Sequence, residues 1–232
     1  MSQDSLPSRQ RRSFLTRLNT GLASLAATAG LAMAAKKPPE TSRWQPARHE
    51  KDDWLDQNNA KHRVLFDSIV SDGLGDALAF ASNYYLANQA DYGLNDSDLA
   101  VVIVLRHRSA LFGYNDAMWA KYGEPLAARA KLEDPKTKQA PKVNMYNSVG
   151  YGELLLNRGV TLDGLANHGA QFAVCQLSTR AFAASIAKAT GGKADDIFTE
   201  LSANMITNAR LVPAGIVAVN RAQERGYTLM GV

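Results

Sequence analysis

The sequence has a single cysteine, Cys175, among its 232 residues. One thiol excludes an intramolecular disulfide, a Cys-x-x-Cys redox pair and a zinc site built from cysteines. The four histidines show no paired spacing on one helix face, and the acidic residues that follow His49 are interpreted as solvated, so no metal is predicted. Apolar residues make up 46% and charged residues 21%, which excludes disordered, collagenous and disulfide-scaffold classes.

The excess of positive charge is concentrated at the start of the chain. Four of the 26 basic residues but only one of the 22 acidic residues lie within residues 1–35, which leaves 22 basic and 21 acidic residues for the remainder. Proteins that bind nucleic acids carry a basic patch or stripe on the folded part. The sequence shows no such patch, so a nucleic-acid partner is not predicted.

Residues 1–35 have the parts of an export signal. The pair Arg11-Arg12 is followed by Phe and Leu, then by an Ala- and Leu-rich run over residues 18–34 that closes on Ala-Met-Ala. A charged region, a short apolar region and a small-x-small cleavage site are typical of a secretory signal peptide. The alternative is an amphipathic or disordered N-terminus. We expect a twin-arginine signal peptide, a periplasmic protein, and membrane contact only through an uncleaved signal.

Residues 36–60 are polar and contain three prolines, so they are predicted to form an extended N-terminal arm. From residue 61 to residue 232 the hydrophobic pattern alternates between strands and helices. Strands are predicted at 62–69, 99–105, 170–175, 209–212 and 227–232. Helices are predicted from 72 through 85, at 115–122, 146–158 and 162–168, from 178 or 179 through 187, and at 195–206 and 214–225. This alternation predicts an α/β domain, a single three-layer sandwich with a mainly parallel sheet of about five strands.

A glycine-containing turn and a basic triplet each follow a predicted strand. The turn, Asp-Gly-Leu-Gly-Asp at residues 72–76, lacks the third glycine of a dinucleotide fingerprint, so it is interpreted as a tight turn into a helix. The triplet is Arg106, His107 and Arg108, which follow the buried strand at 99–105. Ligands gather beyond the carboxyl ends of strands in open α/β sheets, and two arginines there can hold an oxyanion. The alternative is a surface charge cluster.

Cys175 ends the third predicted strand and precedes a predicted helix start. A thiol at a helix N-terminus with Arg180 nearby is favoured as the thiolate. The alternative is a buried, inert cysteine that acts as a small hydrophobic residue. A Cys175–His168 hydrolase pair is not favoured, because His168 precedes the strand and is expected at its opposite end.

The residues around Cys175 also carry a family resemblance. The run at 169–180, Gly-Ala-Gln-Phe-Ala-Val-Cys-Gln-Leu-Ser-Thr-Arg, resembles the cysteine strand and turn of the DsrE/DsrF-like sulfur-relay family. The C-terminal runs 211–217 and 223–227 are similar to that family's closing helix and strand. The resemblance covers about residues 61–232 and implies a DsrE-like fold, homo-oligomers that are often trimers or hexamers, and a cysteine that carries sulfur as a persulfide between partner proteins. Only Cys175 matches that cysteine.

Two functional hypotheses follow. In the first, a periplasmic protein accepts or passes a sulfane sulfur through Cys175, with binding residues Arg180, Arg106, His107 and Arg108, no cofactor, and a sulfur-donor or sulfur-acceptor protein as partner. An enzymatic role then extends at most to sulfur transfer. In the second hypothesis the crevice at the carboxyl ends of the strands binds a small anion, or the oligomer is an accessory subunit of a periplasmic redox system. The lack of a second cysteine motivates this alternative.

Overall fold

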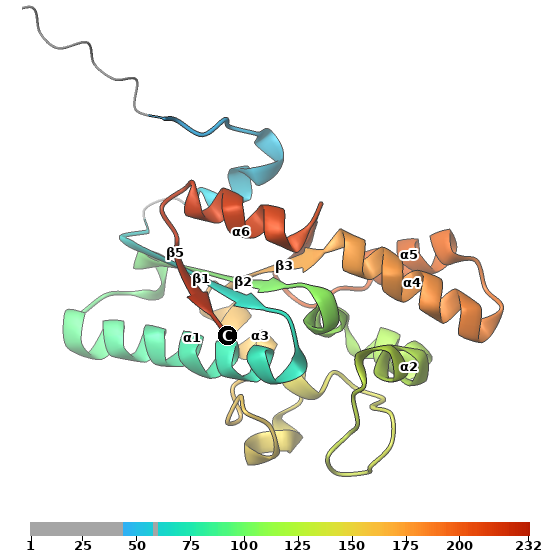
Figure 1. The fold of residues 1–232 in the computed structure, drawn as a ribbon. Helices are drawn as coiled ribbons and strands as arrows, with labels where there is room; N and C mark the ends of the chain where they lie inside the picture. The colour runs from blue at the N-terminus through green and yellow to red at the C-terminus, as the bar shows by residue number, and fades with distance from the viewer. Residues whose placement is uncertain (1–43, 58–59) are drawn as a thin grey trace, which may run out of the picture. The chain divides into compact units, whose positions relative to one another are not determined.

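Five β-strands pair in parallel, in the order β4-β3-β2-β1-β5 across one sheet. The computed structural model describes residues 44–57 and 60–232, which Figure 1 draws in colour. The strands are β1 (His62–Ser68), β2 (Leu99–Leu105), β3 (Gln171–Cys175), β4 (Ala209–Val212) and β5 (Thr228–Gly231). The predicted α/β fold with a single sheet of about five strands is confirmed. The predicted signal peptide at 1–35 lies outside the described residues, as does residue 36 to residue 43 of the predicted arm.

The central strand β2 shows why a buried strand of this sheet could be predicted from the sequence. All seven of its residues are buried, and β1 and β3 flank it on either side. A strand covered on both faces needs apolar side chains at every position, and β-branched residues suit the extended backbone. The run Leu-Ala-Val-Val-Ile-Val-Leu meets both requirements.

Helices cover the two faces of the sheet unequally (Figure 1). The larger core lies between the sheet and α1 (Ser71–Tyr92), α2 (Asp116–Ala130), α3 (Leu162–Asn167), α4 (Gln176–Thr190) and α5 (Ala194–Ala203). The smaller core lies under α6 (Gly215–Gln223). The connection from β4 to β5 runs across the sheet in the opposite direction to the earlier connections. Because parallel crossovers are right-handed, this reversal places α6 on the opposite face.

Part of the predicted arm packs on the α6 face. Residues Glu50–Leu55 form a 3₁₀ helix, and Leu55 is fully buried in the smaller core. The Tyr227 hydroxyl donates a hydrogen bond to the Leu55 carbonyl at 2.8 Å, and Arg225 pairs with Asp56 at 3.4 Å. Pro46–Val232 accordingly pack as one unit.

The helix predicted at 115–122 is present but longer than predicted, and the helix predicted at 146–158 is absent. Helix α2 continues past residue 122 to Ala130 although Pro125 lies inside it, because Leu126 and Ala127 beyond the proline are buried in the core. Tertiary packing there outweighs the cost of a proline in a helix. The helix predicted at 146–158 is replaced by 3₁₀ segments, Met145–Asn147 and Val149–Leu154. Gly152 has a φ of 45° in this segment, a left-handed conformation that glycine adopts readily and that interrupts a helix.

In the turn at 72–76, Gly75 allows a close contact with a neighbouring segment. A Cβ atom on Gly75 would lie 2.8 Å from Cβ of Leu156 and 3.1 Å from the Tyr146 hydroxyl. The irregular segment that replaced the predicted helix therefore packs directly against the first turns of α1. This contact accounts for Gly75 and agrees with the interpretation of the turn as an entry into a helix.

Replacing Gly75 by Ala is expected to lower the free energy of unfolding by about 1–2 kcal/mol. Alanine favours a helix over glycine by about 1 kcal/mol, but the added methyl group overlaps Leu156. Chemical denaturation of Gly75→Ala measures the net effect, and Ala87→Gly, at an exposed position of α1, measures the propensity difference alone. A Gly75→Ala protein stabilised by that same difference would show that the contact does not constrain the helix.

Candidate functional site

Three polar side chains lie at the carboxyl edge of the sheet on the α6 face. In β1, β2 and β3 the residues alternate between the two cores, and Leu65, Val104 and Ala173 belong to the core under α6. Asp67, Arg106 and Cys175 each lie two residues further along the chain, so they face the same side. Leu105 pairs with Val174, which places Arg106 beside Cys175 at the ends of neighbouring strands.

Asp67 holds Arg106 in a bidentate pair. The Arg106 Nε donates to Oδ1 of Asp67 at 2.7 Å, and Nη2 donates to Oδ2 at 2.8 Å. The hydrogen bond to Asp67 raises the pKa of Arg106, burial opposes this, and the charges of Asp67 and Cys175 add to the rise. A planar guanidinium held at two points has a defined orientation. Asp67 therefore fixes the cation that lies beside the cysteine.

The start of α6 packs against Arg106. A Cβ atom on Gly215, the first residue of α6, would lie 2.5 Å from Cβ of Arg106. Only a glycine permits this approach without displacing the arginine. The N-terminus of α6 is thus brought next to Arg106, and helix N-termini favour negative charge.

Cys175 is itself the N-cap residue of α4, and 6% of it is exposed. The prediction that Ser178 or Thr179 caps this helix was wrong, since α4 begins at Gln176. Within the described residues, neither α4 nor α6 has a side chain hydrogen-bonded at its N-cap. The first-turn N–H groups of a helix have no partner inside it. Cys175 consequently lies at one uncapped helix N-terminus, with a second beside its neighbour Arg106.

Ser178 and Thr179 instead tie α4 to neighbouring segments. The Ser178 hydroxyl oxygen accepts a hydrogen bond from the His107 backbone N–H at 2.9 Å. Thr179 donates to the Cys175 carbonyl at 3.1 Å, and the buried Tyr114 hydroxyl donates to the Thr179 oxygen at 3.0 Å. Burial raises the pKa of Tyr114, so this phenol stays protonated as a donor. These bonds hold the backbone of Cys175 in place.

The two other members of the basic triplet lie on the 3₁₀ helix His107–Gly113 that follows β2. His107 is exposed and has a φ of 54°. The backbone N–H of Arg108 donates to the Ile69 carbonyl at 3.0 Å. Across residues 44–57 and 60–232, no carboxylate pairs with Arg108, and its Nε is buried without a partner. The triplet is therefore split: Arg106 is paired with Asp67, His107 is exposed, and Arg108 has no carboxylate partner among the described residues.

Arg180 and His168 lie elsewhere. The Arg180 guanidinium stacks on the Phe198 ring at 4.0 Å from its centroid and reaches Asp195 at 3.7 Å, so its side chain is directed toward α5. His168 Nδ1 contacts Oδ2 of Asp96 at 2.8 Å, just before β2, and the imidazole stacks on Tyr85. The expectation that His168 lies at the opposite strand end from Cys175 is confirmed.

Sequence reasoning missed Asp67, Tyr114 and Gly215. A signal existed for Asp67, because it is a charged residue near the end of an apolar strand and an arginine follows the neighbouring strand. Tyr114 and Gly215 gave no such signal. Their roles depend on which loops the fold brings together.

Replacing Asp67 by Asn is expected to lower the free energy of unfolding by about 1.5–3 kcal/mol, the range for a hydrogen bond to a charged group. The amide would turn an N–H donor toward the guanidinium and leave Arg106 partly unpaired. Chemical denaturation measures the change. Asp195→Asn, which removes a carboxylate that is 96% exposed, should change stability by less than about 0.5 kcal/mol. Equal losses in both variants would contradict a structural role for the Asp67–Arg106 pair.

Comparison with protein-family models, with curated proteins and with solved structures found no match for this chain. In the part of the chain that the structure describes, no three His, Cys, Asp or Glu side chains are grouped so that they could hold a metal ion. None of the described helices is long and apolar enough to span a membrane. The candidate site is therefore defined by its own geometry: a buried thiol at the N-terminus of α4, next to Arg106, which Asp67 orients and against which α6 begins.

Proposed function

We propose that this protein is a periplasmic sulfur carrier of the DsrE-like type, and that Cys175 holds the transferred sulfur as a persulfide. The observation that carries the proposal is the position of Cys175 at the uncapped N-terminus of α4, beside the oriented Arg106. Thiolates and persulfide anions both place negative charge on sulfur. Helix N-termini and neighbouring arginines stabilise that charge.

The loading step conserves atoms and electrons without an added oxidant. The Cys175 thiolate attacks a sulfane sulfur of an inorganic polysulfide, and a new S–S bond forms on Cys175. The S–S bond inside the polysulfide breaks, and the shortened polysulfide leaves with the electron pair. Delivery reverses this chemistry: an acceptor thiolate attacks the outer sulfur, and Cys175 leaves as the thiolate.

The shielding of Cys175 suits a carrier of a labile group. Only 6% of the residue is exposed. A small donor such as polysulfide is therefore expected to reach the sulfur more easily than a bulky thiol. The proposal includes export of the folded protein to the periplasm, supported by the Arg11-Arg12 pair. It also includes a sulfur-donor or sulfur-acceptor protein as partner, supported by the family resemblance of residues 169–180.

Incubation of the protein with polysulfide is expected to add about 32 mass units per sulfur, as a persulfide does. Intact-mass spectrometry before and after a thiol reductant detects the gain and its reversal. Cys175→Ser should show no adduct. A protein that gains no mass, and whose thiol resists alkylation until it is unfolded, would show that Cys175 is core packing only.

Arg106 and Arg180 provide a matched pair of variants. Arg106→Gln removes the cation beside Cys175 and should slow polysulfide loading about tenfold, the effect of roughly 1.4 kcal/mol. Arg180→Gln removes a cation directed toward α5 and should leave the rate unchanged. Time-resolved mass spectrometry gives both rates, and circular dichroism confirms that each variant is folded. If Arg180→Gln slowed loading more than Arg106→Gln, the cation that acts on the Cys175 sulfur would be Arg180 and not Arg106.

Arg108 favours a second candidate, the binding of a small anion without covalent chemistry. Its guanidinium has no carboxylate partner among the described residues, and its Nε is buried. Isothermal titration with sulfite or thiosulfate separates the two functions. Anion binding that survives Cys175→Ser and is lost in Arg108→Gln would support the second candidate.

A further inference from the structure

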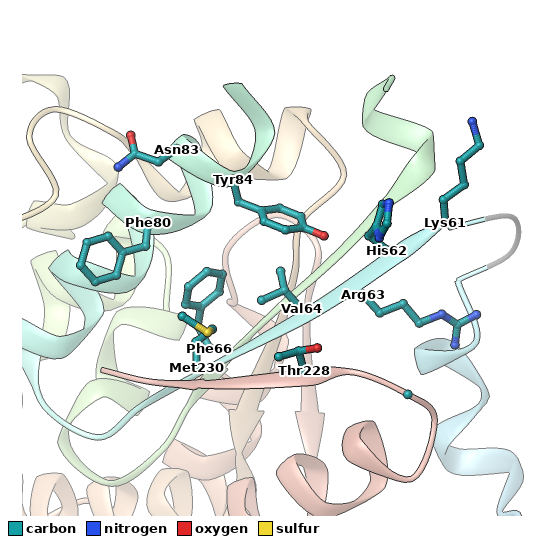
Figure 2. A pocket seen from close by; sticks show the side chains of 11 residues that line it. Lys61, His62, Arg63, Val64, Phe66, Phe80, Asn83, Tyr84, Thr228 and Met230 are labelled. Atoms are coloured by element: carbon teal, nitrogen blue, oxygen red, sulfur yellow. The ribbon is translucent and has the colours of Figure 1, made fainter. Parts of the chain in front are cut away.

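Grooves of similar size lie on the two faces of the sheet. One, of about 620 Å³, lies between α1 and β5, and Figure 2 shows Phe66, Phe80 and Met230 in its apolar part. Phe66 belongs to the larger core, so this groove is on the face opposite to the Cys175 side chain. The other groove, of about 570 Å³, is on the α6 face. Of the two, the second therefore lies on the same side of the sheet as the thiol.

The groove on the α6 face, here called the arm groove, separates the N-terminal arm from the start of α6. Residues 48–52 form its arm side, and Pro213, Val217 and Arg221 form the other side. Val217 and Arg221 are four residues apart, so they lie on one flank of α6. Figure 1 shows the arm beside α6. The arm groove is thus bounded by segments that are far apart in the sequence.

The arm groove reaches the segment that borders Cys175. Cys175 pairs with Val212 of β4, and Val212 belongs to the smaller core, so both side chains face the α6 side. Pro213 is the next residue and lines the groove. Neighbouring strands lie about 4.8 Å apart and each residue adds about 3.3 Å, which places Pro213 about 6 Å from Cys175 along the backbone. The chain then continues to Gly215 against Arg106, so residues 212–215 border both the groove and the candidate site.

The α6 side of the arm groove offers apolar contacts and no net charge. Pro213 is exposed, and Val217 is 39% exposed. Arg221 is neutralised by Asp52, at 3.6 Å, and by Glu224, at 2.7 Å. This side of the groove therefore suits the uncharged stem of a ligand.

The arm side offers one charge of each sign. Glu50 and Lys51 are both exposed, and neither forms an ion pair within residues 44–57 and 60–232. A ligand that complements them has a carboxylate and an ammonium group on one small body. Amino acids and short peptides have this combination, and a cavity of several hundred Å³ is of the size that small-molecule ligands occupy.

We propose that the arm groove binds the organic part of a low-molecular-weight persulfide, and that this amino-acid or short-peptide persulfide is the sulfur donor for Cys175. The inference rests on the proposed function, since it takes Cys175 as the atom that receives the sulfur. The outer sulfur of a persulfide projects beyond the thiol that carries it, so only that atom has to contact the buried cysteine. An extended tripeptide is about 10 Å long, which covers the distance from Cys175 across Pro213 into the groove.

The transfer needs no further reactant. The Cys175 thiolate attacks the outer sulfur of the donor, and an S–S bond forms on Cys175. The S–S bond of the donor breaks, and the donor thiolate leaves with the electron pair while the hydrogen stays on the transferred sulfur. The arm groove then releases a thiol that lacks the sulfane sulfur.

S-methylglutathione tests the groove without sulfur transfer, because its sulfur is blocked. Isothermal titration is expected to show binding to the wild-type protein. Val217→Arg fills the groove and should raise the dissociation constant at least about tenfold, and Lys51→Gln should raise it up to about fivefold, as loss of an exposed charge pair does. The matched controls are Asn220→Arg, on α6, and Lys142→Gln, since both residues are exposed outside the groove. An absence of binding, or binding that Val217→Arg leaves unchanged, would overturn the proposal.

Loading kinetics test the role of the groove in transfer. Time-resolved mass spectrometry compares glutathione persulfide with inorganic polysulfide as donors. Val217→Arg should slow loading from glutathione persulfide about tenfold and leave loading from polysulfide unchanged. Equal slowing of both donors would contradict the inference, because the variant would then act on the thiol itself. If neither donor loads the wild-type protein, the proposed function fails, and the titration still shows whether the groove binds the peptide.

Discussion

The bidentate pair between Asp67 and Arg106 organises the carboxyl edge of the sheet. It joins β1 to the residue after β2, and the Arg106 backbone N–H also donates to the Ser68 carbonyl at 3.2 Å. With Arg106 held in this way, α6 can begin against it at Gly215. The loop after β2 then turns back so that His107 bonds to Ser178 of α4. The end of β1, the loop after β2 and the start of α6 therefore come together around this ion pair, next to Cys175 at the end of β3.

The path of the chain explains why this edge combines two helix N-termini. The first three crossovers build the sheet in one direction, and the last crossover returns from β4 to β5 on the opposite face. The start of α6 consequently lies against Arg106 at the strand ends, on the α6 face of the sheet. Helix α4 starts directly after Cys175. The same return leaves β5 at the edge beside β1. The candidate thiol site and the position of β5 at a sheet edge are therefore two results of one reversal in topology.

The sequence predicted best where burial alone sets the residue types. The strand at 99–105 was predicted with the bounds that the structure has, because a strand covered on both faces needs an unbroken apolar run. Prediction failed where packing between distant segments decides the backbone. Residues 146–158 carry enough apolar residues for a helix, yet their contact with Gly75 and the left-handed Gly152 hold them in 3₁₀ turns. The N-cap of α4 was predicted at Ser178 or Thr179, three or four residues beyond its observed position at Cys175, and that shift also affected the interpretation of Arg180, which is directed toward α5.

By itself, the sequence determined the parallel α/β sheet, the location of Cys175 at a strand end and the separation of Cys175 from His168. These features follow from hydrophobic periodicity and strand order, which are properties of neighbouring residues. Only the tertiary structure decided that Asp67 orients Arg106, that Gly215 admits a helix N-terminus there, and that Arg210 of β4 stacks on Trp54. Each of these pairs residues that are far apart in the chain, and a contact of that kind depends on the direction of every crossover between them.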